Sequence, residues 1–167
     1  AHCHLELSHM KSIIPEKTGL VDFLLMINQQ RAIQSDEDIQ NAIFQADQFM
    51  YDQGIVAVGD ISNTTLTLAH KSESKLIYHT FVECVGLLNS NASQRFEAAE
   101  NIWKEFQKLH SSSLVLHAPY SVSENLIGLV DQASMNKITT IHNQECEAEN
   151  KLFQTGKGDF LKLFEFI

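Results

Sequence analysis

Long apolar runs are missing from this sequence of 167 residues. A membrane span needs roughly 18 to 20 apolar residues, whereas the most apolar stretch, 19–27, is short and contains Asp22. Basic clusters are missing too, because 12 Lys and Arg stand against 21 Asp and Glu, giving a net charge of −9 with the histidines neutral. Such a chain lacks the attraction that nucleic acids and anionic membranes require. We therefore expect neither as a partner.

Cysteine and proline are also scarce. The three cysteines, Cys3, Cys84 and Cys146, lie far apart and form no C-x-x-C motif. This is typical of reduced thiols in a cytoplasmic protein rather than of a disulfide scaffold. Two prolines leave no proline-rich linker, and no repeat or low-complexity segment divides the chain. With 44% hydrophobic residues, including ten Phe, the composition predicts one globular piece with a real core.

Short β-branched or aromatic runs alternate with segments whose apolar residues recur every three or four positions. The first pattern predicts strands over 54–60, 76–83, 113–117 and 137–142. The second predicts helices over 36–53, 92–110 and 121–135, with Ser35 or Asp36 and Ser123 as N-caps. Segment 151–167 is expected to be a loop followed by an amphipathic helix. This alternation indicates parallel βαβ units and an α/β fold. If residues 1–4 end another strand, there are five strand ends, too few for a closed eight-stranded barrel.

Histidines gather at the predicted strand ends: His2, His4, His117 and His142. In a parallel α/β sheet or barrel, side chains from different strands converge at this edge. Because side chains alternate along an extended segment, His2 and His4 share one face and can bind one ion together. For a lone His-x-His pair, a chance occurrence or a satisfied polar pair is favoured over a metal site. Adding His142, with Glu145 three residues later, favours a zinc-type site whose carboxylate moves protons for a hydrolysis.

Other polar residues have plainer interpretations. His117 precedes Ala-Pro-Tyr-Ser and is expected to face the same cavity, or else to be a capping or core histidine. Asp60 ends a predicted strand, where capping of the following loop is favoured over orientation of a ligand. Glu6 follows the histidine pair and is a candidate substrate contact. Glu147 and Glu149 are expected in a solvated first helical turn. The other four histidines are expected to have no role; they are His9, His70, His79 and His110.

Three motifs in order resemble a known family: Ala-His-Cys-His-Leu-Glu-Leu-Ser at 1–8, His-Ala-Pro-Tyr-Ser at 117–121 and Ile-His-Asn-Gln-Glu at 141–145. They resemble the mononuclear aminohydrolases of the amidohydrolase superfamily. That branch includes the guanine, cytosine and methylthioadenosine/S-adenosylhomocysteine deaminases and the triazine-type chlorohydrolases. The resemblance implies a TIM (β/α)8 barrel, here about its first five strand-helix units. It also implies one divalent metal, zinc or alternatively iron, that activates water to displace ammonia or another leaving group.

The resemblance assigns roles to individual residues. His2 and His4 correspond to metal ligands after the first strand, and His142 to the ligand after the fifth. Glu145 corresponds to the proton shuttle, and His117, after the fourth strand, to a substrate-binding histidine. Binuclear members usually carry a carboxylated lysine where His117 stands, so its presence favours the one-metal branch. Glu6 remains a candidate substrate contact beside these residues.

The family also requires a histidine after the sixth strand, an aspartate after the eighth and a small β-sandwich domain, which lie outside this sequence. The chain opens on Ala1 rather than Met. We therefore expect residues 1–167 to be the N-terminal part of the barrel of a longer cytoplasmic enzyme, and to be inactive alone. Because a partial barrel exposes unpaired strand edges, we expect either a homo-oligomer or self-association of this piece.

The predicted activity is hydrolysis of a carbon–nitrogen bond other than a peptide bond. The expected substrate is a small purine-, pterin- or nucleoside-like heterocycle, and the expected reaction is its deamination by a metal-activated water. The first alternative is a chlorohydrolase or another amidohydrolase of the same branch. The second is a non-catalytic barrel fragment with a structural or binding role.

Overall fold

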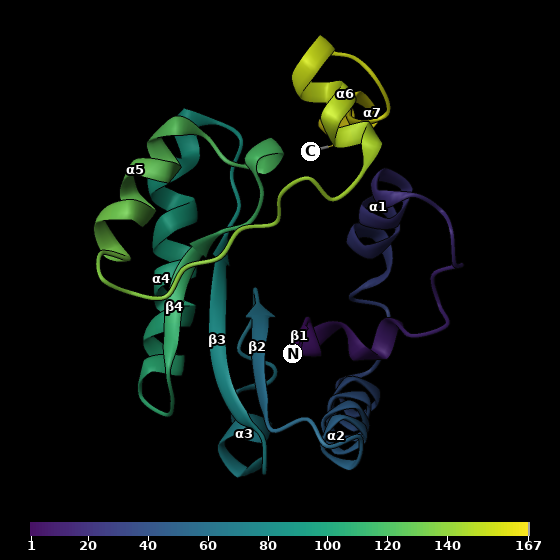
Figure 1. Cartoon of the computed structure of the whole chain (residues 1–167), viewed down its shortest axis with the longest axis vertical. Helices are drawn as coiled ribbons and strands as arrows, with labels where there is room; N and C mark the ends of the chain where they lie inside the picture. Colours follow the sequence, from purple (N-terminus) through teal and green to yellow (C-terminus); the bar gives the residue numbers. More distant parts are fainter. Residues whose placement is uncertain (167) are drawn as a thin grey trace.

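The computed structural model describes residues 1–166, which contain one sheet of four parallel strands (Figure 1). The strands are β1 (His2–Cys3), β2 (Ala57–Ser62), β3 (Ile77–Cys84) and β4 (Ser112–Leu116). Each strand pairs with the next one in the chain, in the order β1-β2-β3-β4. A doubly wound sheet reverses its strand order at a switch point, whereas a (β/α) barrel advances one strand at a time. The topology is that of a barrel segment.

Helices alternate with the strands. They are α1 (Leu20–Gln30), α2 (Asp36–Asp52), α3 (Leu68–Glu73), α4 (Ala92–Gln107), α5 (Glu124–Ala133), α6 (Glu147–Thr155) and α7 (Phe160–Phe166), with 3-10 turns η1 (Leu5–Met10), η2 (Asn89–Asn91) and η3 (Pro119–Ser121). Two of the predicted N-caps are confirmed. Ser35 accepts a hydrogen bond from the Asp38 backbone at the start of α2, and Ser123 accepts one from Leu126 in α5. Each cap satisfies an amide that the first turn leaves free.

One face of the sheet packs against helices. Ile39 and Ile43 of α2 cover Val58 and Tyr78, so α2 is held against β2 and β3. A second cluster joins α4 and α5 to β3 and β4; its buried members include Val82, Trp103, Phe106, Leu114 and Leu126. Because side chains alternate along a strand, the residues between these point to the other face. That inner face is closely packed too: a Cβ at Gly59 would lie 3.0 Å from the Phe81 ring, so a larger residue would displace the ring.

A third apolar cluster lies above the strand ends. Val21 of α1 packs with Phe160 and Leu163 of α7 and with Tyr120 of η3. In Figure 1, α1, α6 and α7 lie beyond the carboxyl ends of β2 and β3 rather than alongside the sheet. This cluster therefore covers the carboxyl edge of the sheet, where the candidate site residues lie.

The α/β barrel-type fold is as predicted, but several elements differ. Segment 137–142 is not a strand; it follows β4 through a hydrogen bond from Ser113 Oγ to the Ile138 carbonyl and one from the His142 amide to the His117 carbonyl. A side chain thus occupies an acceptor that a strand ladder would use. Residues 151–155, predicted as part of a loop, belong to helix α6. Gly156 ends this helix as its left-handed C-cap (φ 67°).

None of the helices within residues 1–166 is long and apolar enough to cross a bilayer. The longest is α2, which is amphipathic and begins with three consecutive acidic residues. That acidic first turn complements the positive end of the helix dipole.

Candidate metal centre and active site

Three imidazoles meet at the carboxyl edge of the sheet. His2, His4 and His142 each offer one ring nitrogen, and these three atoms lie within 4.8 Å of one another. His2 and His4 share a face of the segment that starts with β1, and His142 arrives after α5, beside the end of β4. Neutral imidazole nitrogens in such a group are ligands for zinc and similar ions. The residues therefore fit one divalent metal.

The surroundings of His142 support this fit. Its Nε2 atom is buried and has no well-aligned hydrogen-bond partner in the described part of the chain, although Glu83 Oε1 is 3.2 Å away. Contact with Glu83 raises the pKa of His142 despite burial. Surroundings that favour a proton on this ring also favour a metal cation beside it. Burial, with His142 and His2 nearby, lowers the pKa of His4, which keeps that ring in the neutral form that ligates.

Glu83 is a site residue that sequence reasoning missed. It ends the inner face of β3, is 5% exposed, and its Oε2 accepts a 2.9 Å hydrogen bond from Asn63 Nδ2. Burial raises the pKa of Glu83, but contacts with His142, His117 and Asn63 outweigh burial and hold that pKa below its ordinary value. The signal was present, because Glu83 stands at a predicted strand end and shares a face with Phe81 under the period of two.

Glu145 stands beside the imidazole cluster. Tyr120 donates a 2.9 Å hydrogen bond to Glu145 Oε2, while Oε1 lies 3.8 Å from Nδ1 of His142. Burial and the adjacent Glu145 raise the pKa of Tyr120, so the phenol stays protonated and acts as the donor. The side chain of Glu145 is 30% exposed. One oxygen is therefore held, and the other faces His142 and solvent.

Glu149 corrects a sequence prediction. It is not in a solvated turn but 1% exposed, and its Oε2 accepts a 2.8 Å hydrogen bond from the backbone amide of Glu145. Glu149 lies in the first turn of α6 and reaches back past the N-cap, Cys146. A free amide at a helix start attracts such a carboxylate. Glu147 is exposed as predicted.

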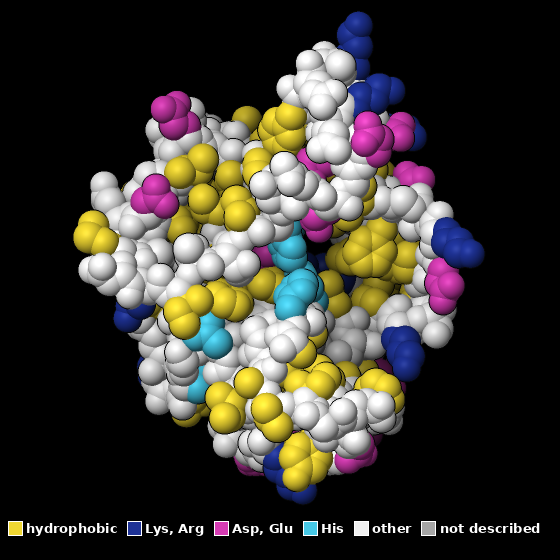
Figure 2. Space-filling view, in the orientation of Figure 1, with side chains coloured by type: hydrophobic (Ala, Val, Ile, Leu, Met, Phe, Trp, Pro, Cys, Tyr) yellow, Lys and Arg dark blue, Asp and Glu magenta, His cyan; other side chains and the backbone are white. Residues whose placement is uncertain are grey.

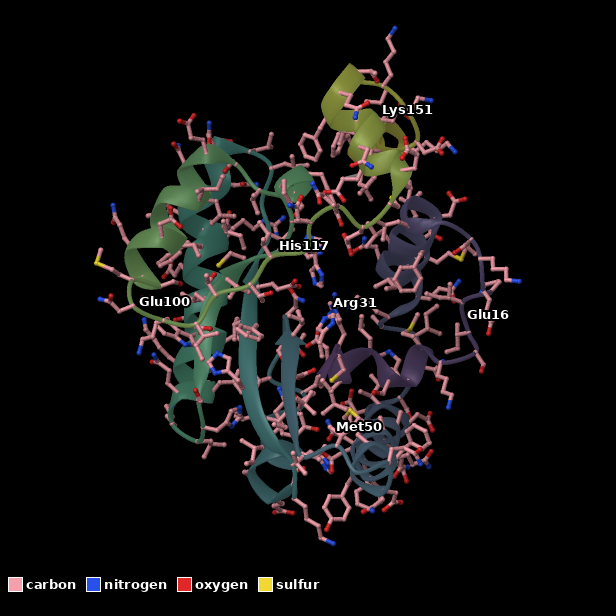
Figure 3. The ribbon with its side chains drawn as sticks, viewed as in Figure 1. Glu16, Arg31, Met50, Glu100, His117 and Lys151 are labelled. Atoms are coloured by element: carbon pink, nitrogen blue, oxygen red, sulfur yellow. The ribbon has the colours of Figure 1, made fainter. Side chains whose placement is uncertain are left out.

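His117 enters the same space from the end of β4. Its Nδ1 lies 2.7 Å from Ser121 Oγ, and its ring packs edge-on against Tyr120 and His142. Burial lowers the pKa of His117, which favours a neutral ring. Figure 3 shows His117 and Arg31 of the α1–α2 connection pointing into one central space. A fixed, neutral imidazole there can exchange hydrogen bonds with a ligand.

A cavity of about 350 Å³ unites these groups. Its polar wall includes His4, Glu83, His117, His142 and Glu145, and its apolar wall is the inward side of α1. Figure 2 shows histidine side chains at a hollow in the middle of this face. The size and the mixed walls suit a small organic molecule. A larger groove of about 900 Å³ lies between η1, α1 and α2, but of the candidate site it contacts only His4.

Glu6 also lines this cavity, but its carboxylate is occupied. Oε2 accepts hydrogen bonds from the backbone amides of Asn63 and Thr64 and from Thr64 Oγ1, and Oε1 pairs with Arg31 at 3.3 Å. Burial raises the pKa of Glu6 more than these partners lower it. The structure thus shows Glu6 holding the turn after β2. The four histidines that were expected to have no role, His9, His70, His79 and His110, do not line this cavity.

No protein-family model and no curated protein matches the chain. Solved structures do. The chain superposes on Helicobacter pylori aminofutalosine deaminase, solved with methylthio-coformycin, with a TM-score of 0.80 and 26% identity over 99% of this chain and 41% of that one. A second structure of that deaminase gives a TM-score of 0.67 and 26% identity, covering 77% of this chain and 35% of that one.

An adenosine deaminase from Xanthomonas campestris with bound zinc gives a TM-score of 0.59 and 16% identity over 98% of this chain and 40% of that one, a likeness of fold alone. The chain thus spans about two fifths of the length of these TIM-barrel deaminases, so its sheet is part of a barrel. In fold, and in sequence to the first of them, the chain is similar to the deaminases of the amidohydrolase superfamily, as its three motifs predict.

Proposed function

We propose that this chain supplies the metal-binding and proton-transfer part of a hydrolase that deaminates a nucleoside-like heterocycle. One observation carries the proposal: three imidazole nitrogens lie within 4.8 Å of one another at the strand edge, beside Glu145, in a cavity that His117 also lines. The names of the similar structures, an aminofutalosine deaminase and an adenosine deaminase, support this substrate class.

His2, His4 and His142 would hold one divalent ion, for which zinc is the first choice and iron the second. When bound, the ion lowers the pKa of a water molecule and so supplies a nucleophile at neutral pH. Glu83 places a negative charge next to His142 and His4, which offsets part of the positive charge of an ion. The further ligands would come from residues beyond this chain. Residues 1–167 would then be the N-terminal part of the barrel.

Glu145 is placed to move protons. One oxygen of Glu145 accepts a hydrogen bond from Tyr120, and the other faces the ring of His142. A carboxylate in this position takes a proton from the attacking nucleophile and delivers it to a ring nitrogen or to the departing amine. His117 orients the heterocycle, because Ser121 fixes its ring. The apolar side of α1, which lines the cavity, would pack against the substrate and exclude water from it.

The test uses the complete protein that carries this chain. Elemental analysis measures zinc and iron, and ammonia release is followed over adenosine, methylthioadenosine, aminofutalosine, guanine and a pterin. We expect about one metal per chain and ammonia from a nucleoside. His142→Ala should lose metal and activity, Glu145→Gln should keep metal and lose activity, and His79→Ala, at the opposite end of β3, should keep both. A folded protein without metal or turnover would refute the proposal, and release of chloride in place of ammonia would favour the chlorohydrolase reading.

A further inference from the structure

Asp60 forms a fully buried polar network on the helix-facing side of β2. Its Oδ2 pairs with Nζ of Lys71 from α3, and neither side chain has any exposed surface. The ammonium of Lys71 also donates to Thr80 Oγ1 at 2.9 Å and to Ser62 Oγ at 3.3 Å. An ammonium has three hydrogens, so its donors are all used. The ion pair uses only Oδ2 of Asp60, so Oδ1 can accept hydrogen bonds from other groups.

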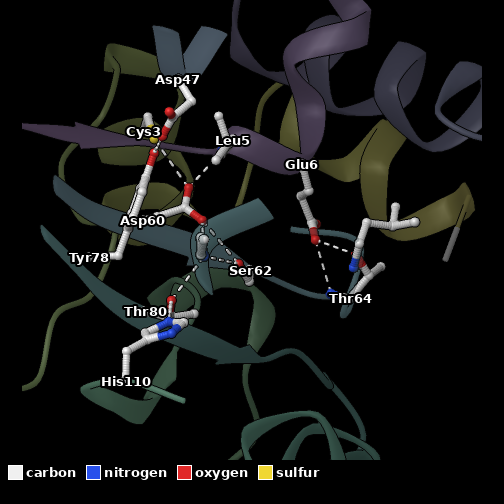
Figure 4. A network of polar contacts seen from close by, with 12 residues as sticks. Cys3, Leu5, Glu6, Asp47, Asp60, Ser62, Thr64, Tyr78, Thr80 and His110 are labelled. Carbon is white, nitrogen blue, oxygen red and sulfur yellow. Dashed lines mark hydrogen bonds and ion pairs between the residues drawn. The ribbon is translucent and has the colours of Figure 1, made fainter. Parts of the chain in front are cut away.

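That second oxygen binds the histidine segment. Asp60 Oδ1 accepts a 2.7 Å hydrogen bond from the backbone amide of Leu5 and a 3.2 Å contact from Cys3 Sγ (Figure 4). Burial and the nearby Asp60 raise the pKa of the Cys3 thiol, which keeps it a protonated donor. Cys3 and Leu5 are the two neighbours of His4. One carboxylate oxygen therefore holds the chain on both sides of this imidazole.

Burial of Leu5 in the cluster with α2 holds the side chain of this segment, but few backbone hydrogen bonds fix its course. Strand β1 has two residues, and its register with β2 ends at the pair of Cys3 and Asp60. His4 follows at the N-cap of η1, and the Leu5 amide, the first of this helix, has no acceptor within the helix and binds Asp60 instead. Asp60 was expected to cap the loop after β2; Glu6 holds that loop instead, and Asp60 reaches across to β1.

We propose that Asp60, paired with Lys71, is a positioning residue that fixes the backbone on both sides of His4 and thereby aims this imidazole at the metal site. The proposal rests on the metal site of the proposed function. Partners that orient metal ligands without touching the metal typically change metal affinity 10- to 100-fold when removed. We expect a loss of zinc affinity in this range when Asp60 can no longer bind Leu5.

The decisive variant replaces both charges. Single replacement of Asp60 leaves Lys71 buried without a counter-ion and risks unfolding, whereas an apolar pair of similar volume is often tolerated. The double variant Asp60→Leu/Lys71→Met removes the hold on Leu5 without leaving a lone charge. The matched control is Asp47→Asn, a buried carboxylate of α2 that binds Tyr78 and Ser74 but nothing in the histidine segment. It should lower stability and leave zinc affinity within about twofold of the parent.

Zinc affinity is measured in the complete protein by competition with a chromophoric chelator, and urea unfolding of the metal-free forms gives their stability. The cobalt-substituted spectrum reports ligand geometry independently of turnover. A 10- to 100-fold weaker zinc affinity and an altered cobalt spectrum in the double variant, with neither change in Asp47→Asn, supports positioning. Parent-like affinity and spectrum in a folded double variant overturn it while the proposed function stands. If the parent protein binds neither zinc nor iron, both proposals are overturned.

Discussion

Glu149 provides the sharpest test of how Glu145, the proposed proton-transfer residue, is held. Replacement by Ala removes the 2.8 Å hydrogen bond that its carboxylate accepts from the Glu145 amide. Hydrogen bonds to charged groups contribute about 1.5 to 3 kcal/mol, and an acidic residue in the first helical turn adds about 0.3 to 1 kcal/mol. Release of a carboxylate that is 1% exposed offsets part of this loss. We expect a net destabilisation of about 1 to 3 kcal/mol.

The measurement is urea unfolding followed by circular dichroism, together with kcat in the complete protein. Since Glu149 fixes the backbone of Glu145, kcat should fall about tenfold or more, as small misplacements of reacting groups do. Glu147 lies two residues earlier in the same turn and is exposed. Glu147→Ala is therefore the matched control and should stay within about 0.5 kcal/mol of the parent. If Glu149→Ala matches this control in stability and in kcat, the argument about the helix start is wrong.

Three further outcomes are expected. Zinc at about 100 times its dissociation constant for the parent protein should stabilise that protein by roughly 2.7 kcal/mol, measured by thermal unfolding. His142→Ala should abolish this gain at the same zinc concentration. An equal gain in the variant would exclude His142 as a ligand. Glu83→Gln should weaken zinc binding about 10- to 100-fold in a chelator competition, and unchanged affinity would show that its charge does not act on the site. Burial lowers the pKa of His110, so the unfolded chain binds a proton at this histidine more readily than the folded chain does. The free energy of unfolding should therefore fall as the pH falls from 6.5 towards the pKa of His110 in the folded state. His110→Gln should flatten this dependence when urea unfolding is measured at each pH.

The fold could be predicted because its main signals are local. Period and composition distinguish short buried strands from amphipathic helices, and the sequential spacing of these elements leads to a parallel barrel-type sheet. Segment 137–142 has the β-branched residues of a strand, yet the Ser113 side chain binds its Ile138 carbonyl. Composition cannot reveal that competition, because it depends on a residue of another strand.

The candidate site was predictable to the extent that it follows strand ends. That rule locates His2, His4 and His117 correctly, and His142 through a predicted strand that the structure lacks. It applies equally to Glu83, but a single carboxylate carries no pattern comparable to the histidines. The burial of acidic residues in the first turn of α6 was not predictable from sequence. Glu147 and Glu149 are the same residue type in the same turn, and only the packing of α6 against the site buries Glu149. The burial of Lys71 likewise follows from Asp60, a partner on another element.

The separation of the three imidazoles along the sequence has a thermodynamic consequence. His4 lies near the first residue and His142 near the end of the sheet region, and 137–142 follows β4 without a strand ladder of its own. An ion bound by both would act as a cross-link that closes a loop of more than a hundred residues. In the chain-entropy treatment, closing a loop of about 100 residues stabilises the folded state by roughly 4.7 kcal/mol. Metal release and loss of order in β1 and in segment 137–142 are therefore expected to occur as one cooperative event.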